Sequence, residues 1–479
     1  MKVIALLVAA SVSVAGVGTG QGVPLQPVRR AALGPLRVDS ANPRYFNDGH
    51  GGVVFLTGSH TWLTLQDAGF TDPPPRFDYR RFLDFLVAHN HNFLRLYTWE
   101  EAKWTNEAKS PYWFEPLPFL RTGPGLAMDD KPRFDLTQLD PRYFLRLRER
   151  VAAAGARGIY VSIMLFNGWS IDQKSAPGAN PWVGHPFNRA NNVNGIDGDP
   201  YHTGYGRYSE TLRVPGVAAV QEDYIRHVVD AVNDLDNVLY EITNEGDSTS
   251  LPWQYHMVYA VKRFERGNPK HHPVGITAPW PSLETNEALF ASPADWISPD
   301  GRAGTGQLES GAKVIIYDTD HLCSPCTPPG FAWKALTAGL NPILMDPYLV
   351  ADSGMGVAPP YRSDDPGYEL LRKSLGYALT YANRVDLKRM RPRSDLAGTG
   401  HCLASTGADG EFLVYLPKGD TVTVDLRANP GPLRVEWFSP ARNQVVSAPA
   451  VPGGSSVTLR APLSGEAVLY LSGRRQVPR

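Results

Sequence analysis

The sequence predicts an α/β fold: a (β/α)8 TIM barrel followed by a small all-β sandwich domain. The 479-residue chain is too long for one compact sandwich and fits a large domain plus a smaller one. Strand-like apolar runs alternate with helix-like runs from residue 53 to 382, as in βα units that build a parallel sheet. Beyond residue 386, short alternating runs are separated by Gly, Pro, Asp and Asn, which is typical of an antiparallel sandwich.

Each predicted barrel strand leads into polar or aromatic residues. The eight strands are expected at 53–56, 93–97, 160–166, 238–242, 274–277, 296–298, 314–317 and 342–345. Apolar residues at helical spacing predict helices at 79–88, 143–156, 217–232, 253–266 and 368–382. The sandwich strands are expected at 412–416, 421–426, 433–438, 456–459 and 467–471. The long connections around Trp104 and Trp113, and at 170–215, are expected to be loops that wall a cleft.

The N-terminus has the layout of a secretory signal peptide. Lys2 precedes an apolar run at 3–14, and small residues follow through Gly20. We therefore expect a signal peptide at 1–20, a barrel at 21–385 and a sandwich at 386–479, in a secreted or periplasmic protein. No later stretch is long and apolar enough to span a membrane.

Composition limits the classes of partner. The formal net charge is −1, which argues against nucleic acid or an anionic membrane surface as a partner. Eleven Trp and 21 Tyr, several just after predicted strands, suit stacking on sugar rings, with core packing as the alternative. We expect a monomer whose partner is a polysaccharide or oligosaccharide.

The cysteine content predicts neither a disulfide-built domain nor a metal centre. The chain has three cysteines, and the simplest disulfide joins Cys323 to Cys326, leaving Cys402 free. A structural zinc site needs two more ligands near that pair, and His321 alone does not supply them. We expect no metal and no cofactor.

The stretch Asn237 to Asp247, NVLYEITNEGD, is interpreted as a buried strand that ends at an active site. Asn244 and Glu245 come where this strand leaves the sheet. In a (β/α)8 barrel the chemistry lies at the carboxyl ends of the strands, so Glu245 is a candidate catalytic residue. The alternative is a helix N-terminus capped by Asn244 or Ser248, where the helix dipole favours Glu245 and Asp247.

A second carboxylate is expected across the barrel mouth. Asp318 directly follows the seventh predicted strand, and Asp320 comes two residues later on the same side of an extended chain. Glycoside hydrolysis needs two facing carboxyl groups, about 5 to 5.5 Å apart in the retaining mode. We prefer Asp318 over Asp320 as the nucleophile, with a loop-capping role as the alternative for Asp318.

Further candidates lie at strand ends. Arg95 on the second strand can hold the nucleophile ionised, or can be part of a surface salt bridge. Candidates for binding sugar hydroxyls are His60, Asn167, Asn244, His321 and Asp346, although a lone histidine is often simply packed. Candidates for stacking on sugar rings are Trp62, Trp99, Trp169 and Trp280, with core packing as the alternative.

Several segments resemble known families. The Asn244-Glu245 pair, with a later strand ending in a carboxylate, resembles the clan A glycoside hydrolases. Closer similarity comes from YFNDGHGGVVFLTGSHTWLTLQD (45–67), ADWISP (294–299), YDTDHL (317–322), NPILMDPY (341–348), TGHCLA and FLVYLP. These segments resemble secreted bacterial proteins that join an apiosidase-like barrel to a tail labelled a collagen-binding domain.

The resemblance implies that Glu245 is the acid/base, that Asp318 or Asp320 is the nucleophile, and that Asn244 binds the 2-hydroxyl of a sugar. Two departures stand out. Many clan A members carry Glu on strand seven, where this chain has Asp, and apiosidases place Asp on strand four. We expect a secreted, retaining glycoside hydrolase. The alternative is a non-catalytic carbohydrate- or collagen-binding protein on the same scaffold. A peptidase is not supported, because the chain has no HExxH helix and no nucleophilic Ser or Cys setting.

Overall fold

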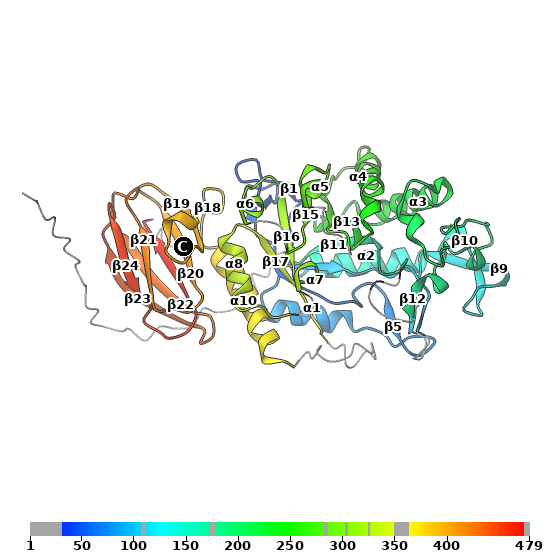
Figure 1. Ribbon diagram of the computed structural model, residues 1–479, viewed down its shortest axis with the longest axis horizontal. Helices are drawn as coiled ribbons and strands as arrows, with labels where there is room; N and C mark the ends of the chain where they lie inside the picture. The colour runs from blue at the N-terminus through cyan, green and yellow to red at the C-terminus, as the bar shows by residue number, and fades with distance from the viewer. Residues whose placement is uncertain are drawn as a thin grey trace, which may run out of the picture. The chain divides into compact units, whose positions relative to one another are not determined.

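The computed structural model describes residues 31–106, 112–172, 174, 179–280, 286–301, 305–323, 326–348 and 364–473. The chain divides between Arg389 and Met390 into a barrel unit and a C-terminal β unit, which Figure 1 colours from blue to yellow and from orange to red. The signal peptide predicted at 1–20 lies outside the described residues. Among these residues, no helix has the length and hydrophobicity to cross a membrane.

The barrel unit is built on a closed barrel of eight parallel strands, which confirms the predicted fold class. The strands are β4 (Gly58–His60), β6 (Phe93–Leu96), β11 (Tyr160–Asn167), β13 (Val238–Asn244), β14 (Val274–Thr277), β15 (Trp296–Ser298), β16 (Val314–Asp318) and β17 (Asn341–Met345). Pairing follows chain order, and β17 closes the ring onto β4. Almost every strand residue is buried, because side chains fill the inside and helices cover the outside.

The first barrel strand is not the one predicted. Val53–Val54 forms β3 of a small antiparallel sheet, with β1 (Arg37–Val38) and β2 (Phe46–Asn47). The barrel strand begins later, at Gly58. A Cβ at Gly58 would lie 2.0 Å from the carbonyl oxygen of Phe93, so only glycine permits this close approach to β6. The apolar run at 53–56 marked the wrong segment because the true strand, Gly58–His60, has no apolar side chain.

The main outer helices confirm the prediction to within two residues at each end. They are α1 (Tyr79–Ala88), α2 (Pro141–Gly155), α3 (Pro215–Val232), α4 (Leu251–Glu265) and α10 (Pro366–Ala382). Four begin two residues earlier than expected, because each carries a proline in its first turn, where the missing N–H costs nothing. The shorter helices are α5 (Asn286–Ala291), α6 (Thr305–Leu308), α7 (Thr319–Cys323) and α8 (Phe331–Thr337).

The connections expected as loops contain additional structure. A sheet in the order β12-β7-β8-β5 joins β5 (Asp67–Gly69), β7 (Lys103–Asn106), β8 (Tyr112–Glu115) and β12 (Ala179–Asn180). β9 (Phe119–Leu126) and β10 (Pro132–Leu139) form a hairpin. Short 3-10 turns follow at η1 (Pro181–Gly184), η2 (Arg189–Asn191), η3 (Arg207–Glu210) and η4 (Ser248–Ser250). The described parts of this first connection, 101–106 and 112–139, are therefore mainly β structure, which corrects the prediction of a loop.

The C-terminal unit is all-β, as predicted. A sheet in the order β18-β19-β20-β25-β22-β23 packs against the pair β21-β24. The strands are β18 (Arg391–Pro392), β19 (Cys402–Ser405), β20 (Glu411–Leu416), β21 (Thr421–Asp425), β22 (Leu433–Ser439), β23 (Gln444–Val451), β24 (Ser456–Arg460) and β25 (Ala467–Ser472), with a turn η5 (Ser394–Leu396). Three of these strands, β18, β19 and β23, were not predicted.

The cysteine pairing is the one expected from the sequence. Cys323 and Cys326 form a disulfide, and Cys402 is a buried free thiol.

Candidate active site

Glu245 lies directly after β13, at the carboxyl-terminal mouth of the barrel. The helix N-terminus alternative placed the cap at Asn244 or Ser248, whereas the cap of the following turn is Asp247, whose side chain accepts from Thr249 N at 2.9 Å, and Glu245 precedes that cap. Glu245 has a φ of +47°, a left-handed conformation that non-glycine residues seldom adopt. The side chain is 7% exposed. Its backbone and side chain are thus both held in unusual settings.

The carboxyl group of Glu245 is suited to hold a proton near neutral pH. Burial and the nearby charge of Asp320 raise the pKa of Glu245 to about 8, against the opposing influence of Trp169, Lys174 and Arg95. Trp169 contributes through its indole N–H, which donates to Oε2 of Glu245. Glu245 therefore stays largely protonated at neutral pH.

Asp318 is the last residue of β16, and its carboxylate is fully occupied. Arg95 Nη1 donates to Oδ2 at 2.9 Å, His60 Nε2 lies 3.0 Å from the same oxygen, and Asp320 N donates to Oδ1 at 2.9 Å. Burial alone would raise the pKa of Asp318, but the charges of His60 and Arg95 outweigh it and hold the pKa below its usual range. Asp318 is a buried, permanently ionised group.

Asp320 does not lie on an extended strand, which corrects that expectation. It lies in the first turn of α7, two residues after β16 ends. Burial and the neighbouring Asp318 raise the pKa of Asp320 to about 6, and a 3.1 Å contact with Arg95 Nη1 opposes this. Asp320 therefore ionises below neutral pH but remains basic enough to react.

The spacing of the acids distinguishes the two aspartates. A carboxylate oxygen of Glu245, one of Asp320 and a ring nitrogen of His321 all lie within 4.8 Å of one another. Asp318 instead belongs to a second group of the same tightness, with His60 and Asp320. Either group has the spacing of a cation site, and the expectation of no metal stays a prediction.

Arg95 is the buried centre of the site rather than part of a surface salt bridge. It is 1% exposed. Its Nε donates to Glu241 at 2.9 Å and its Nη2 to Asn244 Oδ1 at 2.7 Å, while Nη1 serves both Asp318 and Asp320. One planar guanidinium thus fixes the geometry of three carboxylates and an amide.

Three of the predicted hydroxyl ligands surround this centre. His60 pairs with Asp318 as described. Asn244 Nδ2 donates to the hydroxyl of Tyr97 at 2.9 Å, and its Oδ1 also lies 3.2 Å from His321 Nε2. Ser298 holds the other ring nitrogen of His321 at 2.7 Å, and burial lowers the pKa of His321 to about 3, so the imidazole is neutral.

Other predicted contacts have different structural roles. Asp346 is fully buried and both its oxygens accept from Arg372, at 2.8 and 2.5 Å. Asn167 is also fully buried: its amide donates to Thr98 O and its Oδ1 accepts from Trp169 N. Neither side chain is available to bind a sugar hydroxyl, so both predictions are corrected.

Of the four tryptophans predicted to stack on sugar rings, some are packed in the core and others are not. Trp62 and Trp99 are 7% and 3% exposed and belong to one apolar cluster, so the core-packing alternative holds for them. Trp169 packs partly against that cluster and contacts Glu245. Trp280 is 40% exposed, which leaves it available for stacking.

Sequence reasoning missed several residues of the site. Glu241 is the most informative, because a single acid inside the apolar run of a barrel strand is itself a signal of a buried partner, here Arg95. Tyr97 and Lys174 gave no such signal: a tyrosine ending an apolar run looks like core, and Lys174 lies in a long irregular segment. Lys174 Nζ donates to the backbone oxygen of Glu245 at 2.9 Å.

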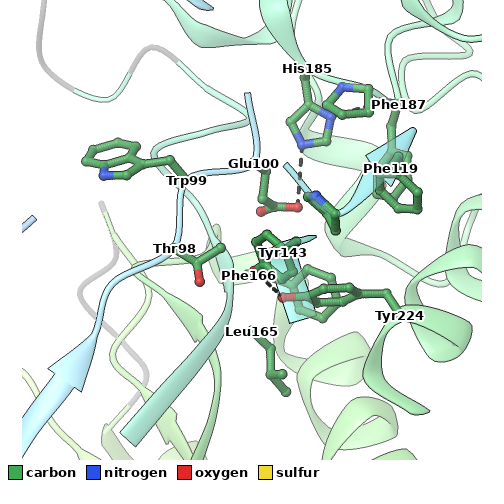
Figure 2. Close-up of a pocket in the computed structure, with 12 residues that line it drawn as sticks. Thr98, Trp99, Glu100, Phe119, Tyr143, Leu165, Phe166, His185, Phe187 and Tyr224 are labelled. Carbon is green, nitrogen blue, oxygen red and sulfur yellow. Dashed lines mark hydrogen bonds and ion pairs between the residues drawn. The ribbon is translucent and has the colours of Figure 1, made fainter. Parts of the chain in front are cut away.

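A cavity of about 20 Å³, room for a single water, adjoins the segment that carries Asn167 and Trp169. Figure 2 shows the Glu100 carboxylate directed at His185, with Tyr143 and Tyr224 joined below through their hydroxyls. The ring nitrogen of His185 lies 3.4 Å from Oε2 of Glu100, and Asn167 N donates to Oε1 at 2.8 Å. Glu100 thus supports the strand end that positions Trp169.

Fold and geometry together define a (β/α)8 barrel protein with a buried carboxylate site at its C-terminal mouth. Residues 101–280 match a family described as Domain of unknown function (DUF6298). This match spans less than half of the chain. No curated protein matches the chain.

Two solved structures illustrate how widely the fold is shared. A structure described as a glycoside hydrolase is 11% identical, with a TM-score of 0.58 over 92% of this chain and 97% of the other. A glycoside hydrolase family 5 protein from Bacteroides vulgatus ATCC 8482 is 12% identical, with a TM-score of 0.56 over 91% and 93% of the two chains. At such low identity the similarity establishes the fold alone.

Proposed function

We propose that this protein is a secreted glycoside hydrolase that cleaves a polysaccharide or oligosaccharide by a two-carboxylate, retaining mechanism. The observation that carries the proposal is the pairing of Glu245 with Asp320, whose carboxylate oxygens lie within 4.8 Å of each other at the barrel mouth. Retaining glycosidases place their two carboxyl groups about 5 to 5.5 Å apart, whereas inverting enzymes need room for a water between them. The described glycoside hydrolases of the same fold support the same class.

In this mechanism the two acids need opposite protonation states. Asp320, with a pKa of about 6, is ionised at neutral pH and attacks the anomeric carbon. Glu245, with a pKa of about 8, donates its proton to the leaving oxygen. Glu245 then takes a proton from the water that cleaves the glycosyl bond to Asp320, which restores both acids.

The structure favours Asp320 over Asp318 as the nucleophile, which reverses our preference from the sequence. Both oxygens of Asp318 accept hydrogen bonds from Arg95, His60 or the backbone of Asp320, and the side chain is 0% exposed. A nucleophile needs a free lone pair facing the substrate. Asp318 is better suited to hold Arg95, whose guanidinium also contacts Asp320 and favours its ionised form.

The finer parts of the proposal rest on other support. The disulfide between Cys323 and Cys326 fits an oxidising compartment and hence secretion. The apiosidase-like substrate class and the collagen-binding label of the C-terminal unit rest on sequence resemblance alone. A formal net charge of −1 and an exposed Trp280 fit an uncharged carbohydrate partner.

The experiment is a screen of the purified protein on polysaccharides and aryl glycosides, together with Glu245→Gln, Asp320→Asn and Asp318→Asn. We expect sugar release that Glu245→Gln and Asp320→Asn each reduce by at least about 10³-fold, with retained anomeric configuration by NMR. Asp230→Asn, at an exposed acid of α3, is the matched control. If no substrate is cleaved while sugar or collagen still binds, the protein is a binding protein instead.

A further inference from the structure

The left-handed backbone conformation of Glu245 is not explained by its position at the end of strand β13 alone. A non-glycine residue at a φ of +47° is strained and persists only where its surroundings impose it. Gly168 packs against this backbone so closely that a Cβ there would lie 2.3 Å from Glu245 O. Contact with Gly168 excludes other positions of the carbonyl group, but it supplies no attraction that holds it.

Lys174 supplies that attraction. Its Nζ donates to Glu245 O at 2.9 Å and to Trp280 O at 2.6 Å. Trp280 N in turn donates to Gly246 O at 2.9 Å. Lys174 follows β11, Glu245 follows β13 and Trp280 follows β14, so one ammonium group ties together the segments after three barrel strands.

The surroundings of Lys174 are acidic. Burial lowers the pKa of Lys174, and the charges of Glu210, Glu245, Asp172 and Asp247 offset this lowering only in part. Glu210 is 1% exposed and accepts from Thr243 Oγ1 at 2.5 Å. The two backbone oxygens that accept from Nζ favour the charged, ammonium form of Lys174.

We propose that Lys174 is a positioning residue: its ammonium fixes the backbone of Glu245 and acts on the carboxyl group as a nearby positive charge. The role of Glu245 as acid/base rests on the proposed function, but the proton affinity of its carboxyl group does not. The charged and titratable groups that face Glu245 are Asp320 and His321 from α7, Arg95 and Tyr97 from β6 and its end, and Lys174 from the segment after β11. Removing Lys174 takes away one of only two cations in that set.

Trp169 provides a reporter that requires no substrate. Because its indole N–H donates to Glu245, its ¹⁵N–¹H signal should move as Glu245 ionises. The signal is assigned as the one that Trp169→Phe removes from the spectrum of ¹⁵N-tryptophan-labelled full-length protein. Asp320 titrates nearby, so the upper of two steps is assigned to Glu245.

We expect Lys174→Met to raise the midpoint of the upper step by about one pH unit. Lys174→Gln keeps hydrogen-bond donors without the charge and should raise it similarly, while Lys174→Arg should leave it near the wild-type value. The matched control is Lys313→Met: Lys313 Nζ also bridges two backbone oxygens, Ser292 O and Ala294 O, but at the opposite end of β16.

If the midpoint of the upper step is the same in Lys174→Met and Lys174→Gln as in the control Lys313→Met, Lys174 does not act on Glu245 through its charge, and the proposal is wrong. Unchanged signals of the other tryptophans show that a variant is folded. If Lys174→Met does not fold, the midpoint measured for Lys174→Gln tests the proposal in its place. A protein without glycosidase activity would refute the proposed function and leave this titration valid, so the two failures are distinguishable.

Discussion

At the scale of single residues, the site is a cluster of buried acids around too few cations. Arg95 cannot lose its proton, and it binds Glu241 and Asp318 directly. Asp318, whose pKa is held below its usual range, is the acid that this charge helps to keep ionised. The excess of negative charge is relieved at the other two acids, Asp320 and Glu245, whose pKa values are both raised. The two acids whose pKa values are raised are thus the pair that faces each other.

This charge balance predicts a narrow pH profile. With Asp320 as nucleophile, kcat/KM should rise as pH increases through about 6, because Asp320 must be ionised. It should fall as pH increases through about 8, because Glu245 must keep its proton. The measurement is kcat/KM from pH 4 to 10 on the best substrate of the screen.

The same profile tests the choice of aspartate. The pKa of Asp318 is held below its usual range, so an enzyme that used Asp318 as nucleophile would stay active well below pH 5. A broad acid limb of that kind would show that Asp320 is not the nucleophile.

At the scale of elements, the sequence predicted the strands whose side chains are mainly apolar. Strands such as Val274–Thr277 and Trp296–Ser298 were predicted to the residue, because they are short apolar runs bounded by Pro, Asp or Gly. Gly58–His60 was missed because small and polar residues form this strand. Its position is set by the close packing of the Gly58 backbone against Phe93, which has no apolar signal in the sequence.

The site was predictable in part, for a related reason. The order of strands around a barrel is fixed by the fold, so residues at strand ends, such as Arg95 and Glu245, could be placed at one mouth from the sequence. The choice between Asp318 and Asp320 depends on the boundary between β16, which ends at Asp318, and α7, which begins at the next residue. The sequence pattern does not locate a boundary to one residue. Side-chain partners such as Arg372 for Asp346 come from distant segments and have no local signal.

Gly168, which follows β11, allows a test of how elements place the acid/base. Gly168→Ala would put a Cβ 2.3 Å from Glu245 O and 3.0 Å from Asn244 O, so the turn after β13 must shift. A misplacement of about 1 Å can cost about 10²-fold in rate, and we expect such a loss in kcat. The matched control is Gly267→Ala, because nothing lies within 4 Å of a Cβ there. If both variants keep wild-type kcat, the close approach of Gly168 does not position Glu245.

At the scale of the whole molecule, the barrel unit carries an unusual load of buried ionisable groups. Burial raises the pKa values of Glu101, Glu210 and Glu245 to about 8. Neither oxygen of Glu101 has a hydrogen-bond partner among the described residues. Burial also lowers the pKa values of His91 and His321 to about 3. Each group lowers the stability of the folded protein in the pH range between its folded-state and unfolded-state pKa values, because there the unfolded chain ionises the group and the folded protein keeps it neutral.

These shifts give stability a predictable dependence on pH. The folded-state pKa values of the three glutamates lie above the unfolded value, so the folded protein binds more protons than the unfolded chain between about pH 4.5 and 8. Stability should therefore fall as pH rises through that window, by about 1.4 kcal/mol per pH unit for each group. The two histidines act in the opposite sense, since stability falls as pH drops from about 6.5 toward 3. Above pH 6.5 the histidines no longer contribute, and only the loss caused by the glutamates remains.

We accordingly expect urea unfolding to give a lower free energy at pH 8.5 than at pH 6.5. Tryptophan fluorescence reports mainly on the barrel unit, because every tryptophan except Trp437 lies there. Glu101→Gln keeps the shape of the side chain but removes its ionisation, so the decrease between the two pH values should shrink by about 1 to 2 kcal/mol. Glu149→Gln, an exposed acid of α2, should leave the decrease unchanged. A free energy that rises between pH 6.5 and 8.5 in the wild-type protein would mean that these buried glutamates are ionised and paired in the folded state.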